Sequence, residues 1–78
     1  MNFQEWLIDE KKYSNKGSGD VISRMKRIKR ILGKDEMDEN SLMELQGTSE
    51  FATLSMNVKS QLRRAIRLFL EFKSNDKQ

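Results

Sequence analysis

The sequence predicts a small all-α domain, a bundle of four to five helices, and three observations lead to this prediction. The chain has 78 residues and no proline, so one domain is expected and the strongest helix breaker is absent. Apolar residues recur at spacings of three and four, and no segment alternates with the period of two that is typical of a strand. Lysine, glutamate, leucine and arginine, which favour helices, are abundant.

The first helix is expected to begin at Phe3, with Asn2 as its N-cap, and to fade around Lys12 or Tyr13. The segment 14–19 contains two glycines, two serines and an asparagine, so it is predicted to be a loop. The apolar face of this helix is expected to consist of Phe3, Trp6 and Leu7.

The second helix is expected to be capped by Ser18 or Asp20 and to end at Gly33, because glycine readily adopts the left-handed conformation that follows a helix. Its apolar stripe is Val21, Met25, Ile28 and Leu32. Its opposite face carries Ser23, Lys26, Arg27 and Arg30. The pattern therefore indicates an amphipathic helix with a basic outer face.

An acidic connector at residues 35–40 is expected to lead into a short third helix that stops before Gly47. Ser41 and Glu44 have the spacing of a capping box, in which the two side chains each bind a backbone N–H at the start of a helix.

The core is expected to take up nearly all the large apolar residues, because a domain of this size has few of them. Residues 48–54 could form one turn that places Phe51 and Leu54 in this core. The aromatic residues assigned to it are Phe3, Trp6, Phe51, Phe69 and Phe72.

A long last helix is expected to begin at Ser55 or Asn57 and to run to about Lys73. We expect one helical domain over residues 1–73 and a polar tail at residues 74–78. The core stripe of this helix is Val58, Leu62, Ala65, Ile66, Phe69 and Phe72. Its other side carries Lys59, Ser60, Arg63, Arg64 and Arg67.

Charge is segregated along the chain in blocks, and these blocks are more informative about possible binding surfaces than the net charge of +3. Residues 20–34 carry six basic and one acidic side chain, residues 35–57 carry six acidic and no basic ones, and residues 58–78 carry six basic and two acidic ones. The basic helix faces predict phosphate contacts with a nucleic acid. The alternatives are that both faces are simply solvated, or that they pair with the acidic segment 35–57.

Several function classes have little support in the sequence. The chain lacks cysteine and histidine, so a disulfide, a thiolate metal site and the commonest general base are all excluded. The carboxylates of Asp9, Glu10 and Glu44 show no diagnostic catalytic spacing. We expect a protein that is not an enzyme, with no metal and no cofactor. Since no apolar run could span a membrane and the N-terminus does not resemble a signal peptide, we expect a cytoplasmic location and no membrane partner.

The order of motifs resembles a known family. The chain opens with Phe-Gln-Glu-Trp-Leu, continues with Val-Ile-Ser-Arg-Met-Lys-Arg-Ile, and ends with Asn-Val-Lys-Ser-Gln-Leu-Arg-Arg-Ala-Ile-Arg-Leu-Phe-Leu-Glu-Phe. Over residues 3–72 this is similar to the N-terminal core-binding domain of phage-integrase-type tyrosine recombinases, a SAM-like bundle of four or five helices. The resemblance lies in apolar positions and helix lengths, not in invariant chemical residues.

The resemblance implies contacts with duplex DNA, mostly through phosphates and some major-groove edges, because helices of the family's domain clamp one face of the duplex. The residues at matching positions are Ser23, Arg24, Lys26, Arg27, Arg30, Lys59, Ser60, Arg63, Arg64 and Arg67. The family's catalytic domain has no counterpart in this sequence. The resemblance therefore implies an excised domain, or a stand-alone relative of phage or prophage origin that binds DNA passively or interferes with a recombinase.

The alternative from another class is a small protein-interaction adaptor or regulator of phage or prophage origin. Its basic residues would pair with an acidic partner surface. Its apolar centre would be formed by residues off the main stripes, namely Tyr13, Leu68 and Leu70.

Overall fold

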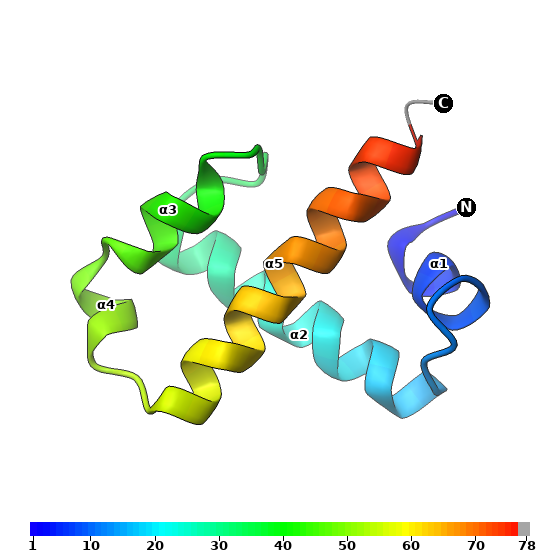
Figure 1. Cartoon of the computed structure of the whole chain (residues 1–78), viewed down its shortest axis with the longest axis horizontal. Helices are drawn as coiled ribbons and strands as arrows, with labels where there is room; N and C mark the ends of the chain where they lie inside the picture. Colours follow the sequence, from blue (N-terminus) through cyan, green and yellow to red (C-terminus); the bar gives the residue numbers. More distant parts are fainter. Residues whose placement is uncertain (77–78) are drawn as a thin grey trace.

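The structure, a computed structural model, describes residues 1–76 as a bundle of helices without strands, which confirms the predicted all-α class (Figure 1). The helices are α1 (Phe3–Asp9), α2 (Asn15–Leu32), α3 (Ser41–Gln46), α4 (Ser49–Ala52) and α5 (Met56–Asp76). In this part of the chain no helix combines the length and the apolar character needed to cross a membrane.

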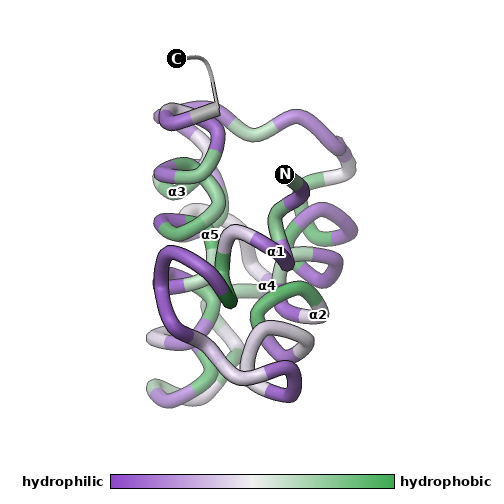
Figure 2. The backbone as a smooth tube through the Cα atoms, turned by 90° about the vertical axis from the view of Figure 1, so that its right-hand side faces the viewer, coloured by the Kyte–Doolittle hydropathy of each residue, from purple (hydrophilic) through white to green (hydrophobic). Residues whose placement is uncertain are grey.

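The bundle is flat, because its two long helices cross and pack directly on each other. Figure 1 looks down the shortest axis, with α5 in front of α2, and Figure 2 shows the same arrangement from the side. The extents of the molecule are 34 × 26 × 16 Å, so the shortest dimension has room for about two layers of helices. Helices α1 and α3 pack against both long helices, and α4 packs against α3.

The apolar stripes predicted from the sequence meet in one core. Among the fully buried side chains are Leu7 of α1, Ile28 of α2, Leu45 of α3, and Leu62 and Ile66 of α5. An aromatic cluster at one end joins α1 to α5, with ring centroids 5.1 to 6.4 Å apart, and consists of Phe3, Trp6, Phe69 and Phe72. Trp6 is buried and the other three are half-buried, so the predicted assignment of these aromatics to the core is confirmed.

The connector between α2 and α3 contributes a core residue that the sequence analysis did not anticipate. Met37 is only 3% exposed, although its neighbours in the chain are acidic and exposed. The Nζ of Lys73 in α5 donates a hydrogen bond of 3.0 Å to the Met37 carbonyl oxygen. The connector is therefore held to the core by the buried Met37 side chain and to α5 by the Met37 carbonyl oxygen.

The predicted loop at residues 14–19 is wrong, because α2 begins already at Asn15. Ser14 is the N-cap, and its Oγ accepts a hydrogen bond of 3.0 Å from the N–H of Gly17. The chain turns between α1, which ends at Asp9, and α2 with Lys12 at a φ of 62°. The expected fading of α1 at Lys12 or Tyr13 is thus replaced by an earlier end and a tight turn.

Ser18, which was expected to cap α2, lies fully buried inside its first turns. Its Oγ donates to the carbonyl oxygen of Asn15 (2.8 Å) and accepts from Nε2 of Gln4 in α1 (3.3 Å). Serine competes with helix formation in isolated chains because its hydroxyl binds nearby backbone groups. Here that hydroxyl is satisfied within the helix and across to α1, and its small size allows the two helices to approach.

The predicted capping box at Ser41 and Glu44 is also wrong. Asn40 occupies the N-cap position without a side-chain hydrogen bond. The Ser41 Oγ instead accepts from the N–H of Asp38 (2.8 Å), so it holds the turn before the helix. Glu44 accepts a hydrogen bond from the Lys34 Nζ at 2.9 Å and does not reach back to the helix start.

The last two helices follow the prediction closely. Thr48 caps the single turn of α4 and Phe51 is buried, as proposed for residues 48–54. The Ser55 Oγ accepts a hydrogen bond of 3.3 Å from the N–H of Val58 at the start of α5. Helix α5 extends to Asp76, so residues 74–76 of the expected tail are helical, and residues 77–78 lie outside the described residues.

Candidate nucleic-acid interface

The solvent side of α2 carries a row of basic side chains, which we call the α2 face. It lies opposite the buried stripe of Val21, Met25 and Ile28, as helical geometry requires. Arg24 is half-buried at its flank, and Asp20 is an exposed acidic residue near its N-terminal half. The α2 face consists of the exposed residues Lys16, Ser23, Lys26, Arg27 and Arg30.

Lys16 was missed by the sequence analysis because its segment was assigned to a loop. Once α2 begins at Asn15, Lys16, Ser23 and Arg30 follow one another at intervals of seven residues, about two helical turns. The signal that could have found it is this heptad spacing, read together with Ser14 as a cap.

The solvent side of α5 carries a second basic row, which we call the α5 face: Ser60, Arg63, Arg64 and Arg67. Ser60, Arg64 and Arg67 are exposed and Arg63 is half-buried. Together with Leu68 and Glu71 these residues line a shallow hollow of about 430 Å³.

Lys59 lies at the flank of α5 and not on its outer face. Its Nζ is 5.8 Å from the centroid of the Phe51 ring, and the guanidinium of Arg63 lies at the same distance from that ring. The Nη1 of Arg63 also donates to Oε1 of Gln46 at 3.4 Å. Lys59 and Arg63 thus cover a buried aromatic ring, which leaves Arg64 and Arg67 as the freely extended bases of this helix.

The structure does not bring the α2 and α5 faces together. Because α2 and α5 pack apolar stripe against apolar stripe, their outer faces point away from each other. Figure 1 shows α5 in front of α2 along the shortest axis of the molecule. Of the ten residues predicted from the sequence, eight lie on two opposite sides of the molecule, and Arg24 and Lys59 lie at the flanks of their helices.

The acidic segment pairs with bases outside both faces. Lys34 binds Glu44 at 2.9 Å and Lys73 lies 3.4 Å from Glu36. The third ion pair joins α1 to α5 through Lys11 and Glu71. Within residues 1–76 no salt bridge reaches a basic residue of the α2 face or the α5 face. Among residues 1–76 the acidic segment 35–57 therefore forms no salt bridge with the bases of either face, contrary to the alternative in which it pairs with them.

Two pKa shifts reflect the internal charge contacts of the connector. The pKa of Lys34 is raised, chiefly by its hydrogen bond to Glu44. The pKa of Asp38 is lowered, chiefly because the N–H of Asn40 donates to its Oδ1 at 2.8 Å. Both groups lie in the connector region, away from the basic faces.

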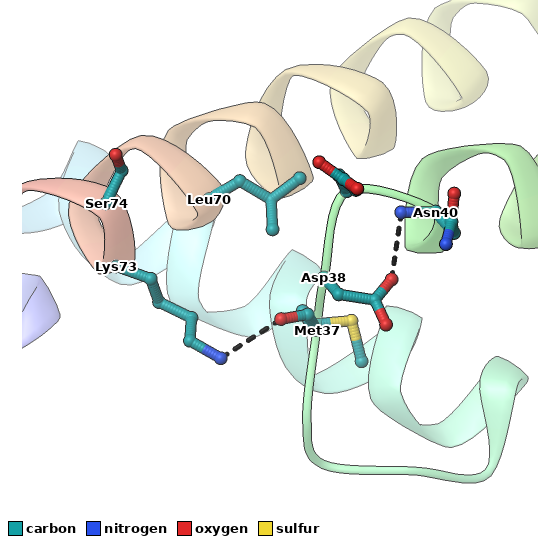
Figure 3. Close-up of a pocket in the computed structure, with 7 residues that line it drawn as sticks. Met37, Asp38, Asn40, Leu70, Lys73 and Ser74 are labelled. Atoms are coloured by element: carbon teal, nitrogen blue, oxygen red, sulfur yellow. Dashed lines mark hydrogen bonds between the residues drawn. The ribbon is translucent and has the colours of Figure 1, made fainter.

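The residues proposed for an apolar partner contact do not form one patch. Tyr13, Leu68 and Leu70 are all half-buried and pack against the core. Leu68 and Leu70 lie on opposite flanks of α5, about 160° apart around its axis. Leu70 faces a hollow of about 440 Å³ that the connector closes with Met37, Asp38 and Asn40 (Figure 3). The adaptor hypothesis thus lacks the apolar centre on which it was based.

The side chains of both faces are suited to binding anions. Guanidinium and ammonium groups bind phosphate oxygens, and serine hydroxyls can donate a short hydrogen bond to them. No group of three or more side chains suited to holding a metal ion occurs among residues 1–76.

Comparisons with models of known protein families, with curated proteins and with solved structures find no match to this chain.

Proposed function

We propose that this chain is a non-catalytic domain that binds duplex DNA by contacting backbone phosphates with exposed basic side chains. The observation that carries the proposal is that the bases of the α2 and α5 faces take no part in the ion pairs made by the acidic residues of the described chain. Their charge is therefore available to an external polyanion.

The dimensions of α2 are compatible with several phosphate contacts. From Lys16 to Arg30 the helix rises about 21 Å, at about 1.5 Å per residue. Duplex DNA carries one negative charge per about 1.7 Å of its axis, so a row of four bases on this length meets several phosphates. Ser23 lies between these bases and can add a neutral hydrogen bond.

The resemblance of residues 3–72 to the core-binding domain of phage integrases suggests DNA as the polyanion, but the α2 and α5 faces point to opposite sides, so the two helices do not contact one duplex together as the resemblance implied. It also suggests that the domain acts at the sites of a recombinase or alongside one, in a phage or prophage setting. Aromatic residues are absent from both faces, which argues against a single strand held by base stacking.

A titration of fluorescently labelled duplex DNA, followed by anisotropy at about 50 and about 200 mM salt, tests the proposal. If three or four phosphates are neutralised, affinity is expected to fall about 40- to 150-fold between these conditions. No binding at the lower salt by a protein with a helical circular dichroism spectrum would overturn the proposal, as would binding that is insensitive to salt.

Substitutions in the two basic faces test whether these faces bind the DNA. Replacing Arg27, Arg30, Arg64 and Arg67 with alanine is expected to lower affinity by at least about tenfold and to flatten the salt dependence. The control is K12N/K34Q, which removes two positive charges outside both faces. Because K12N/K34Q removes two positive charges and the four-substitution variant removes four, dependence on net charge alone would make the fall in log affinity of the control about half that of the four-substitution variant. A clearly smaller fall is expected in the control, and a fall of half or more would mean that net charge alone governs binding.

A further inference from the structure

We propose that a single copy of this chain bridges two DNA duplexes, one held by the α2 face and the other by the α5 face. This inference rests on the proposed function and adds a second activity to it. It follows from where the tertiary structure places the two basic rows, which the sequence order does not reveal.

The α2 and α5 faces point in opposite directions. The buried sides of α2 and α5 meet in the core, where Ile28 of α2 and Ile66 of α5 are fully buried. Helix α5 lies in front of α2 along the shortest axis, whose extent is 16 Å (Figure 1). The exposed arginines, which lie opposite the buried stripe of each helix, therefore extend outward from opposite sides of the molecule. Each side offers a row of bases with a serine in it, Ser23 on one and Ser60 on the other.

One duplex cannot reach both faces. To touch opposite sides of a body 16 Å thick, a duplex would have to turn back on itself within a few base pairs. The persistence length of DNA is about 500 Å, so such a turn is prohibitive for a domain of this size. Simultaneous occupation of both faces thus requires two duplex segments.

Two duplexes can bind to opposite sides of the domain without prohibitive electrostatic repulsion. They would be separated by at least the thickness of the domain, and the Debye length is about 10 Å at 0.1 M salt. At 0.1 M salt their mutual repulsion is therefore largely screened, and at about 50 mM, where the Debye length is about 14 Å, it is partly screened, whereas each basic row remains in direct contact with its own phosphates. The exposed carboxylate of Glu71, at the end of the α5 face, is paired with Lys11.

A capture assay tests bridging directly. Biotinylated duplex is immobilised on beads, protein is added at about 50 mM salt, and retention of a second, fluorescent duplex is measured. Wild-type protein is expected to retain the second duplex. The protein must be monomeric by analytical ultracentrifugation at the assay concentration, because bridging by a dimer through one repeated face would overturn the inference.

Variants that each lack one face provide the decisive comparison. R27A/R30A and R64A/R67A change only exposed side chains, so both are expected to keep the wild-type circular dichroism spectrum. Each is expected to bind a single duplex in the anisotropy assay but to retain at least tenfold less of the second duplex. The charge-matched control K12N/K34Q is expected to retain far more of it than either.

The outcomes separate this inference from the proposed function. Wild-type protein that binds one duplex but captures no second one would refute bridging and leave DNA binding intact. Loss of all binding in one face variant, with no effect of the other, would mean a single interface and would also refute bridging. Absence of any binding by wild-type protein would overturn both proposals.

Discussion

The burial of Met37 makes a sharp prediction about stability. Met37 is 3% exposed, whereas Met43 of α3 is 75% exposed, so the two methionines form a matched pair within one small domain. Met37→Ala removes the side-chain atoms Cγ, Sδ and Cε from the core. Met43→Ala removes the same atoms from a side chain that is mostly in water.

The expected cost of Met37→Ala follows from this geometry. Three lost heavy atoms at about 0.8 kcal/mol per methylene give about 2.4 kcal/mol, and measured losses for such substitutions range over about 2–5 kcal/mol. Met37 borders an open hollow with Leu70, into which neighbours can relax, so we expect the lower part of that range, about 2–3 kcal/mol. Met43→Ala is expected to stay within about 0.5 kcal/mol of wild type.

Urea unfolding followed by circular dichroism and by the fluorescence of Trp6, the single tryptophan, measures both free energies of unfolding. The melting temperature of Met37→Ala is expected to fall by about 10–20 °C, from about 4–8 °C per kcal/mol in a domain of this length. If Met37→Ala and Met43→Ala unfold within about 0.5 kcal/mol of each other, the connector is not pinned to the core as described.

The remaining predictions concern the ends of α2 and the connector, and urea midpoints check all of them. Gly33→Ala is expected to lower the free energy of unfolding by about 1 kcal/mol, because Gly33 has a φ of 69°. Gly19→Ala lies within a helix and has open space around the new methyl group, so it is expected to raise the free energy of unfolding by about 0.5–1 kcal/mol. The reverse order of these two midpoints would contradict the assigned helix end. Ser14→Ala removes the N-cap hydrogen bond and is expected to lower the free energy of unfolding by about 1 kcal/mol. An unchanged urea midpoint would indicate that residues 14–19 form a loop and not the start of α2. The pKa of Asp38 is lowered from 3.8 in the folded state, so its contribution to stability is complete above that value and is lost as the pH falls through the folded-state pKa. Asp38→Asn is therefore expected to be less stable than wild type at pH 6, with a difference that narrows below about pH 4; a difference independent of pH would show that the carboxylate charge does not contribute.

Local periodicity was sufficient to predict the helical fold and most of its core. The stripe of Val21, Met25 and Ile28, and the stripe of Leu62, Ala65 and Ile66, are buried as expected, because each follows the period of one helix and requires no knowledge of its partner. Gly33 ended α2 where expected because the left-handed conformation is a local preference of glycine.

The errors occurred where a polar side chain found its partner through tertiary contact or through a turn. The sequence around Ser18 predicts a loop or a cap, whereas in the structure its hydroxyl lies within hydrogen-bond distance of Gln4 of α1. The spacing of Ser41 predicts a helix cap, whereas in the structure its Oγ accepts a hydrogen bond from the N–H of Asp38 in the preceding turn. The apolar Met37 is a different case: its burial in the core could not be predicted, because a single buried residue between charged neighbours has no periodic signal.

The sequence by itself determined which side chains face outward on each long helix, because the arc opposite an apolar stripe must be exposed. It predicted the bases of α2 and α5 in this way, apart from Lys16 and the flank position of Lys59. Only the tertiary structure decided that α2 and α5 pack stripe to stripe, and this packing directs the two basic rows to opposite sides of the domain. Helical periodicity gives the direction of each side chain relative to the axis of its own helix. The orientation of the α2 axis relative to the α5 axis is set only by the packing of the two helices.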